Sequence, residues 1–243
     1  MRLRTKSVVS IYYLTEHPAS KIDYDFIMSI NSRIFTNQPV GKHMPITKTT
    51  PEAILRSSWA VFHRHGYHDT SVQQLAEAAG LGKAGLLHHF KSKAGLMHAV
   101  IEYALDWYRR KVLAVAKEEG SVAMRLEIVL RRHFELVQYN DGGGCFFANM
   151  TLETGVDGVF SEGLRNFHTE WCAAMEALLS ERFPAAEARE RVYRFFVDYQ
   201  GSVLLFKLYH DPSHLQRFIH RTLRSLDLPI TLNNRDNPTM GQP

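Results

Sequence analysis

The chain has few of the residues and segments that mark secreted, membrane or metal-binding proteins. It contains only two cysteines, Cys145 and Cys172, without CxxC or other metal-ligand spacing, so the sequence predicts two buried, reduced thiols and no metal site. No apolar run is long enough to cross a bilayer, and the amino-terminal region lacks the apolar core of a signal peptide. These absences predict a cytoplasmic protein with no membrane partner.

The sequence also lacks the motifs of common enzyme classes. There is no HExxH, GxSxG, Walker loop or dinucleotide fingerprint, and the glycine-rich NDGGG at 140–144 follows no strand and precedes no Lys-Ser/Thr pair. The histidines at 63, 65 and 68 lack helical ligand spacing, which argues against zinc. We therefore expect a protein that is not an enzyme and has no cofactor. A small helical enzyme stays open as an alternative, built from polar residues that helices would bring together: His98, His133, His168, Glu153 and Asp198.

What the sequence has is a large apolar fraction in helical patterns. Of its 243 residues 45% are hydrophobic, and the formal net charge is +4. The basic excess lies in residues 1–50, with seven Lys/Arg against three Asp/Glu, while residues 120–243 have thirteen against fifteen. No segment before the tail shows strand alternation, so the pattern predicts an all-α protein. The charge distribution fits a nucleic-acid module joined to a neutral binding body.

The most informative stretch is residues 71–90, SVQQLAEAAGLGKAGLLHHF, in which two short helical patterns flank a Gly-Leu-Gly turn. Thr70 or Ser71 would cap the first helix, and Thr70 with Gln73 reads as a capping box. Gly80 would end it. Its apolar residues recur on one helix face: Val72, Leu75, Ala76 and Ala79.

The second helix is expected from Lys83 to about Phe90, a length of roughly 12 Å. Leu86 and Phe90 would face inward, and the exposed side would be small and basic. A helix with small residues on its outer side can approach a DNA groove closely, and a lysine there can contact a phosphate or a guanine edge. The alternative is an ordinary helical hairpin with a solvated face.

Residues 52–97 resemble the DNA-binding domain of the TetR (tetracycline-repressor) family of bacterial transcriptional regulators. The resemblance is carried by a first helix ending in FHRHGYHDTSV and by the following QQLAEAAGLGKAGLLHHFKSKAGL. It implies an all-α fold in which a three-helix helix-turn-helix domain precedes a helical effector-binding and dimerisation domain. The implied double-stranded DNA partner is a palindromic operator, bound by a homodimer.

The resemblance also assigns the DNA contacts. Base readout would rest on Lys83, Ala84 and His88. Leu87 stands where the family usually has a phosphate-contacting tyrosine, and Gly82 where it often has a capping serine. Backbone anchoring would fall to Thr70, Ser71, His89 and Lys93.

The pattern divides the chain into four parts. We expect a poorly ordered extension at 1–43, the DNA-binding domain at 44–93, the ligand-binding and dimerisation domain at 94–228 and a frayed tail at 229–243. Met44 is a plausible native start, which would make 1–43 an upstream extension of the reading frame. The competing interpretation is a basic arm that touches DNA through Arg2, Arg4 and Lys6.

The body is predicted to be a bundle of helices with an aromatic interior. A connector helix is expected from Lys93 to about Glu118, and Asn140–Gly144 is expected to be a turn. CFFANMTLE at 145–153 resembles the effector-domain entry of one TetR branch, which includes regulators of efflux and detoxification genes. Further helices are expected at 122–139, 160–183, 186–209 and 213–226. On the family resemblance, a cavity of about several hundred cubic ångströms for a small apolar effector would have these wall residues: Trp107, Phe147, Met150, Phe167 and Trp171.

In the family the last two helices of each subunit form a four-helix bundle with those of the partner. The sequence therefore predicts a DNA-binding regulator, more specifically a repressor that loses operator affinity when its effector binds. The alternative is a ligand-binding or scaffold protein with weakened DNA reading, which the Leu87 departure allows. The residues expected to carry the dimer are Phe196, Gly201, Leu204, Leu205, Leu208, Leu215, Phe218 and Leu223.

Overall fold

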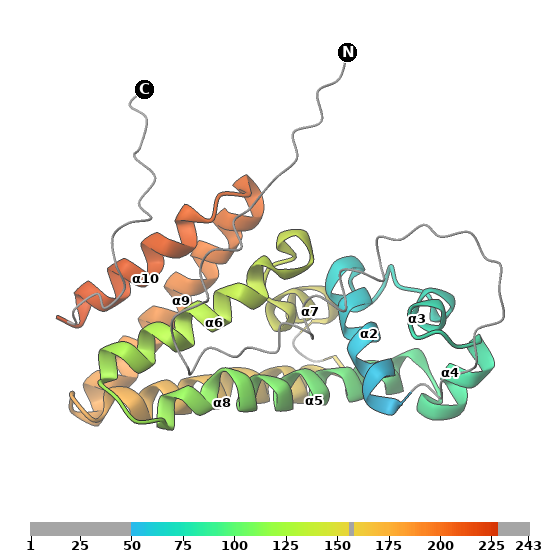
Figure 1. Ribbon diagram of the computed structural model, residues 1–243, viewed down its shortest axis with the longest axis horizontal. Coiled ribbons are helices and arrows are strands. Elements are labelled where there is room, and N and C mark those ends of the chain that lie inside the picture. Colours follow the sequence, from blue (N-terminus) through green and yellow to red (C-terminus); the bar gives the residue numbers. More distant parts are fainter. Residues whose placement is uncertain (1–49, 156–157, 228–243) are drawn as a thin grey trace, which may run out of the picture. The chain divides into compact units, whose positions relative to one another are not determined.

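The computed structural model describes residues 50–155 and 158–227, and all regular structure among them is helical (Figure 1). The expectations for 1–43 and 229–243 lie outside the described residues. None of the described helices is both long and apolar enough to cross a membrane. The elements, labelled as in Figure 1, are α2 (Pro51–His65), α3 (Val72–Ala78), α4 (Lys83–Phe90), α5 (Lys93–Lys111), the 3-10 helix η1 (Leu113–Lys117), α6 (Val122–Gly142), α7 (Phe146–Thr154), α8 (Ser161–Leu179), α9 (Ala185–Tyr209) and α10 (Ser213–Ser225).

The first three described helices, α2 to α4, pack together and against α5 around a small apolar core. α2 begins as expected, with the Thr50 side chain accepting a hydrogen bond from the Ala53 amide and Pro51 in the first turn. α4 spans the residues that the sequence predicts. The side chains that fill this core are almost fully buried: Ile54, Phe62, Leu75, Leu86 and Met97.

The capping box at the start of α3 differs from the predicted one by one residue. Ser71, not Thr70, is the N-cap: its hydroxyl oxygen accepts from the Gln74 amide, and the Gln74 side chain accepts from the Ser71 amide. Thr70 is buried, and its hydroxyl donates to the Gly66 carbonyl at 2.6 Å. The predicted Thr70–Gln73 box is therefore wrong, because Thr70 is used to close the preceding turn.

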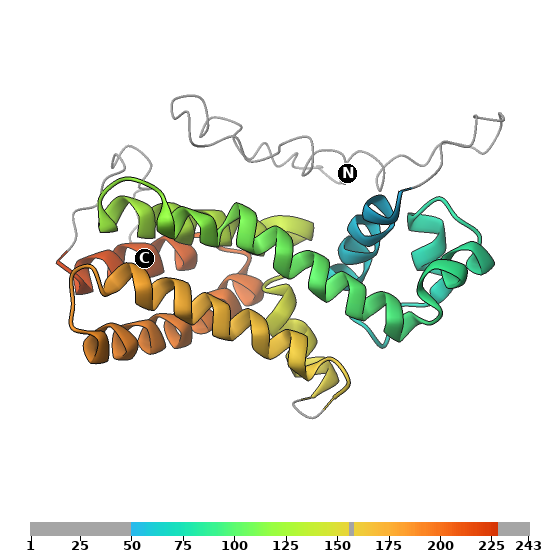
Figure 2. The same cartoon turned by 90° about the horizontal axis from the view of Figure 1, so that it is seen from below.

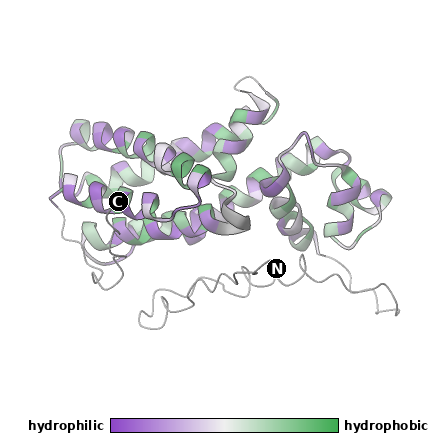
Figure 3. Ribbon diagram, turned by 90° about the horizontal axis from the view of Figure 1, so that it is seen from above, coloured by the Kyte–Doolittle hydropathy of each residue, from purple (hydrophilic) through white to green (hydrophobic). Residues whose placement is uncertain are grey.

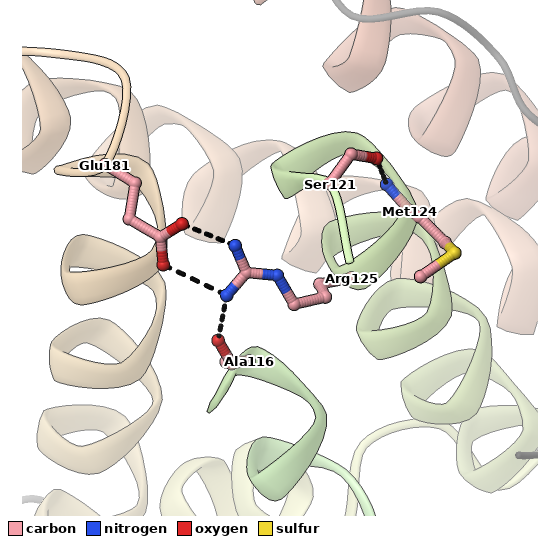
Figure 4. A network of polar contacts seen from close by, with 5 residues as sticks. All are labelled: Ala116, Ser121, Met124, Arg125 and Glu181. Atoms are coloured by element: carbon pink, nitrogen blue, oxygen red, sulfur yellow. Dashed lines mark hydrogen bonds and ion pairs between the residues drawn. The ribbon is translucent and has the colours of Figure 1, made fainter. Parts of the chain in front are cut away.

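The predicted connector helix ends earlier than Glu118. α5 stops at Lys111, and the chain tightens into η1 before α6 begins. The Arg132 guanidinium donates to the Lys111 carbonyl at the end of α5, at 2.8 Å. The Arg125 guanidinium holds the end of η1: it donates to the Ala116 carbonyl at 2.9 Å and pairs with both carboxylate oxygens of Glu181 (Figure 4). A carbonyl at a helix end needs such a donor, and here it comes from a residue nine positions further along the chain.

The body is built from α5 to α10, with α8 packed against both α5 and α9 (Figures 1 and 2). A Cβ at Gly163 would lie 2.8 Å from the Ile101 side chain, so only glycine allows α8 to approach α5 this closely. Arg109 and Glu170 join the same two helices in a two-pronged ion pair. Polar and apolar residues mix along each helix of the body, as expected of helices with one buried face (Figure 3).

The glycine-rich turn is also shorter than predicted. α6 continues through Gly142, so the expected turn at Asn140–Gly144 is wrong for its first three residues. Only Gly143, Gly144 and Cys145 separate α6 from α7. Gly144 has a φ of +83°, a conformation that glycine adopts without strain and that turns the chain into α7.

Candidate nucleic-acid interface and ligand cavity

α4 presents one exposed face made of small and basic residues. Lys83, Ala84, His88 and His89 are exposed, whereas Leu86 points into the core and is almost fully buried. Lys83 occupies the first position of the helix and forms no hydrogen bond or ion pair with any described residue. The geometry therefore leaves these side chains available to a groove, as the sequence predicts.

The two departures from the family pattern have visible consequences in α4. Gly82 is the N-cap and supplies no side-chain hydrogen bond, so the first amides of the helix stay open to an external acceptor such as phosphate. Leu87 is half-buried.

The corner into α5 depends on Gly95, since a Cβ there would lie 2.3 Å from the Phe90 carbonyl oxygen.

Lys93 has a different role from the expected phosphate contact. Its ammonium donates to the carbonyls of Tyr67 and Thr70 at 2.9 Å each and lies 4.4 Å from the centre of the Tyr67 ring. Thr70 is likewise unsuited to a side-chain phosphate contact, because it is buried. Both residues instead fix the loop at 66–70, which joins α2 to α3 and which we call the α2–α3 loop. Sequence spacing could not show this, because Lys93 lies 23 residues or more from these carbonyls.

The α2–α3 loop is also held from the body. The Glu153 carboxylate, in the last turn of α7, accepts hydrogen bonds from the amides of Tyr67 at 2.8 Å and His68 at 2.5 Å. A Cβ at Gly66 would lie 2.6 Å from the same carboxylate. Lys93 thus binds the carbonyls of the loop and Glu153 its amides, so the start of α3 is fixed to α7 as well as to α5.

A small cavity of about 30 Å³ lies inside the body. Of the predicted wall residues, Phe147 and Phe167 line it, whereas Trp107, Met150 and Trp171 are buried in the core beside it. The expected volume of several hundred cubic ångströms is absent from this cavity because aromatic rings fill the space. Phe147 and Phe167 stack face to face at 3.9 Å. Room remains for one or two water molecules.

The cavity has a polar wall that sequence reasoning missed. His133 lies between two tyrosine hydroxyls, with Tyr108 at Nδ1 and Tyr199 at Nε2, and Tyr199 also interacts with the Cys145 thiol. Burial raises the pKa of both tyrosines well above the usual value and lowers that of His133 to about 3. All of these groups are therefore uncharged near neutral pH. The four residues come from α5, α6, α9 and the α6–α7 turn. Sequence spacing could not predict this cluster, because its members are far apart in the chain.

His63 marks the other end of the cavity and joins α2 to the α6–α7 turn. Its Nε2 donates to the Gly144 carbonyl at 2.8 Å, and the ring packs edge-on against Phe146. Burial is the main cause that lowers the His63 pKa from 6.5 to about 4, and the nearby Lys207 charge adds to it.

This burial predicts an acid sensitivity. The unfolded chain protonates His63 below pH 6.5, whereas the folded chain resists until about pH 4, so stability is lost as the pH falls between these values. The matched control is His63→Gln, whose amide N–H can still donate to Gly144 but does not titrate. Between pH 7 and 5 we expect the free energy of unfolding of the wild type to fall by about 2 kcal/mol more than that of the variant, measured by urea denaturation. Equal losses would contradict the assignment.

The predicted dimer residues divide into two groups. Leu204, Leu205 and Leu208 are exposed on α9, and at Gly201 the space beyond the backbone is open. Phe196 is half-buried against Trp171. Three of the predicted residues lie in the core of the subunit and so cannot form the dimer surface: Leu215, Phe218 and Leu223. The exposed apolar residues that the sequence reasoning missed on the same helix are Tyr193, Val197 and Tyr209.

Comparison with known proteins adds a sequence family and a fold. Residues 54–100 match the family model described as bacterial regulatory proteins, tetR family. Over 95 residues the chain is 32% identical to the HTH-type transcriptional regulator RutR of Escherichia coli K12, a match that covers 36% of this chain and 45% of RutR. The chain thus spans less than half the length of this relative. It is 25% identical over 182 residues to the HTH-type transcriptional repressor DhaR of Mycobacterium sp. strain GP1, covering 71% of this chain and 89% of DhaR.

Solved structures extend the likeness to the body. A TetR transcriptional regulator from Legionella pneumophila aligns with a TM-score of 0.67 at 21% identity, covering 75% of this chain and 99% of the other. AibR in complex with isovaleryl coenzyme A and operator DNA aligns with a TM-score of 0.54 at 21% identity, covering 73% and 98%. At these identities the alignments show the shared fold alone.

Proposed function

Because this chain carries a DNA-binding domain of the tetR family and has the all-α fold of TetR-family regulators, we propose that it is a DNA-binding transcriptional regulator. The observation that carries the proposal is the exposed face of α4, in which Lys83, Ala84 and His88 point away from the core of the matching domain. In the finer form of the proposal the chain is a cytoplasmic homodimer that represses transcription. A small effector in the body would release it from its operator.

The direct test is selection of genomic DNA fragments by the purified protein. We expect the recovered sites to be palindromes whose half-sites lie about 34 Å or a multiple of it apart, because a two-fold dimer places one α4 helix in each major groove. Affinity should fall steeply with salt, since phosphate contacts release counterions. Recovery of no common site, with binding that does not respond to salt, would favour the alternative of a ligand-binding or scaffold protein.

The contacts of α7 support a route from effector to DNA. Phe146 and Phe147, at the start of α7, line the cavity, and Glu153 at its end holds the amides of the α2–α3 loop. An effector that widens the cavity would displace α7 and, through Glu153, the start of α3. A coupling free energy of about 1–3 kcal/mol would lower DNA affinity about 5- to 150-fold. The connector helix α5 shares this role, because Lys93 at its start binds the same loop.

This route predicts a specific effect of Glu153→Gln. The substitution replaces one carboxylate oxygen by an NH₂ group that cannot accept from the loop amides. Loss of a charge-assisted hydrogen bond is worth about 1.5–3 kcal/mol, so exchange of the Tyr67 and His68 amides with solvent deuterium should accelerate about 10- to 150-fold. Glu162→Gln, an exposed change on α8, is the control. If the exchange rates of these amides are unchanged in Glu153→Gln, Lys93 alone holds the loop, and α7 does not transmit the effect of the effector to it.

A further inference from the structure

The wall of the cavity has two chemical properties that together restrict what it can bind. Most of it is aromatic, and no lining side chain among the described residues is Lys, Arg, Asp or Glu. At one end its polar atoms come from a buried chain of hydrogen bonds, Tyr108–His133–Tyr199, with each member less than one-tenth exposed, and at the other from His63, whose Nε2 is used by the Gly144 carbonyl. An ion would lose its hydration there without gaining a counter-charge.

The direction of this chain follows from its neighbours. A neutral imidazole has one N–H donor and one acceptor nitrogen, so one tyrosine must donate to His133 and the other must accept from it. The Trp171 indole N–H, a donor only, lies near the Tyr108 hydroxyl without a hydrogen-bond partner among the described residues, so it offers Tyr108 no acceptor. If Tyr108 also accepted from His133, its own O–H would be buried without an acceptor, at a cost of about 1–3 kcal/mol. Tyr108 therefore donates to Nδ1, and His133 donates from Nε2 to Tyr199.

This direction leaves the Tyr199 hydroxyl as the last donor of the chain. Besides His133, its polar neighbour is the Cys145 thiol, and sulfur is a weak acceptor. Both Tyr199 and Cys145 line the cavity. The Tyr199 hydroxyl is thus a poorly satisfied hydrogen-bond donor in an aromatic, uncharged enclosure.

We propose that the effector of this chain is an uncharged, flat molecule whose single acceptor oxygen, a carbonyl or an ether, receives the hydrogen bond of the Tyr199 hydroxyl. The inference rests on the effector-responsive function proposed above and names its ligand class. The flat body takes space now filled by the stacked Phe147 and Phe167 rings, which are 3.9 Å apart and 4° from parallel. Opening this stack enlarges the cavity and acts on α7, which carries Phe147.

The same observations separate this class from anionic effectors. A coenzyme A thioester, as in the AibR complex, brings phosphates that need cationic partners, and none lines this cavity. A carboxylate would face the same desolvation cost. A hydrocarbon of equal shape would enter but leave the Tyr199 donor without its acceptor.

The test is calorimetric titration of the full chain with three matched probes: 2-acetylnaphthalene, its near-isostere 2-isopropylnaphthalene and 2-naphthoate. We expect the ketone to bind about three- to tenfold more tightly than the hydrocarbon, which is the gain from one net hydrogen bond. The carboxylate should bind more weakly than either. The preference for the ketone should disappear in Tyr199→Phe and persist in Tyr103→Phe, which removes the same hydroxyl from a residue of α5 that does not line the cavity.

Three results would overturn the ligand class: no binding of the ketone to the wild type, binding of the hydrocarbon or carboxylate at least as tight, or a ketone preference that survives Tyr199→Phe. If Tyr199→Phe unfolds at a lower temperature than the wild type, the affinities of the three probes for the wild type still test the ligand class. Gel shifts with the selected DNA keep the two proposals apart. Ketone binding without DNA release would support the ligand class and contradict the release mechanism. DNA binding without ketone binding would support the DNA-binding function and contradict the ligand class.

Discussion

Glutamate at both Leu204 and Leu208 is expected to convert the proposed homodimer to a monomer and to lower operator affinity by about 100-fold or more. The two side chains are 65% and 64% exposed in the single subunit and lie four residues apart, so they share one face of α9. Pairing with a second copy would bury them, and two buried glutamates without partners would make that pairing unfavourable. The affinity falls because the second half-site is then no longer bound intramolecularly.

The composition of this face supports the proposal that it is the dimer surface. Tyr193, Val197 and Tyr209 extend the exposed apolar stripe beyond the two leucines along α9. Isolated exposed apolar residues are ordinary, but a contiguous stripe is typical of a protein interface. Gly201, in the middle of the stripe, has open space where a side chain would project, which permits a close approach by a partner helix.

Leu152→Glu is the matched control for the dimer prediction. Leu152 is 86% exposed on α7, away from α9, so the variant gains a charge without touching the stripe. Sedimentation velocity gives the oligomeric state, and gel shifts at fixed salt give the affinity. A double variant that still sediments as a dimer would place the interface on another surface.

Local signals explain why the sequence predicts the DNA-binding part well. α4 begins and ends where expected, and α2 begins at Pro51 after the Thr50 cap. Caps, terminal glycines and short apolar periods act within one or two turns, so they can be interpreted without the rest of the chain. The capping box was misplaced by one residue because Thr70 and Ser71 have equivalent hydroxyls. Only the tertiary bond from Thr70 to Gly66 separates them.

Most of the other errors concern contacts between distant residues. The end of α5 is bound by Arg132 and the end of η1 by Arg125, which pairs with Glu181, and these partners lie beyond any helical period. The amphipathic pattern of α10 identifies an apolar face but not its partner, and Leu215 and Phe218 pack within the subunit. The Tyr108–His133–Tyr199 chain comes from three separate helices. Periodicity predicts which face of a helix is apolar. Which helix packs against that face depends on residues throughout the chain.

Lys83→Ala is expected to weaken specific operator binding by about 1–3 kcal/mol, a 5- to 150-fold increase in Kd. Lys83 is the first residue of α4 and is exposed, and α4 has its buried side, through Leu86, fixed in the domain core. Loss of its ammonium should therefore remove a DNA contact without disturbing the fold. An unchanged affinity in a gel-shift titration at fixed salt would contradict the assignment.

The control for Lys83→Ala is Lys117→Ala, which removes the same charge from an exposed residue of η1 in the body. A change in net charge alone should weaken both variants equally, whereas a contact at the groove should weaken only the first. The salt dependence then separates two kinds of contact. If Lys83 binds phosphate, the slope of log K against log salt should fall by about one charge per subunit and all sequences should be affected alike.

If Lys83 instead binds a guanine edge, the ratio between the affinities for the operator and for mutated half-sites should be smaller in Lys83→Ala than in the wild type. We expect this second result. Ala84 and Gly85 follow Lys83 directly and are exposed, so nothing on this turn of α4 keeps the backbone away from the groove floor. With Leu87 half-buried in place of the usual tyrosine and Lys93 held by the α2–α3 loop, two expected phosphate contacts are weakened or lost. On the proposed binding mode a larger share of the affinity must then come from the groove, and Lys83 is the exposed cation that begins the helix we propose to enter it.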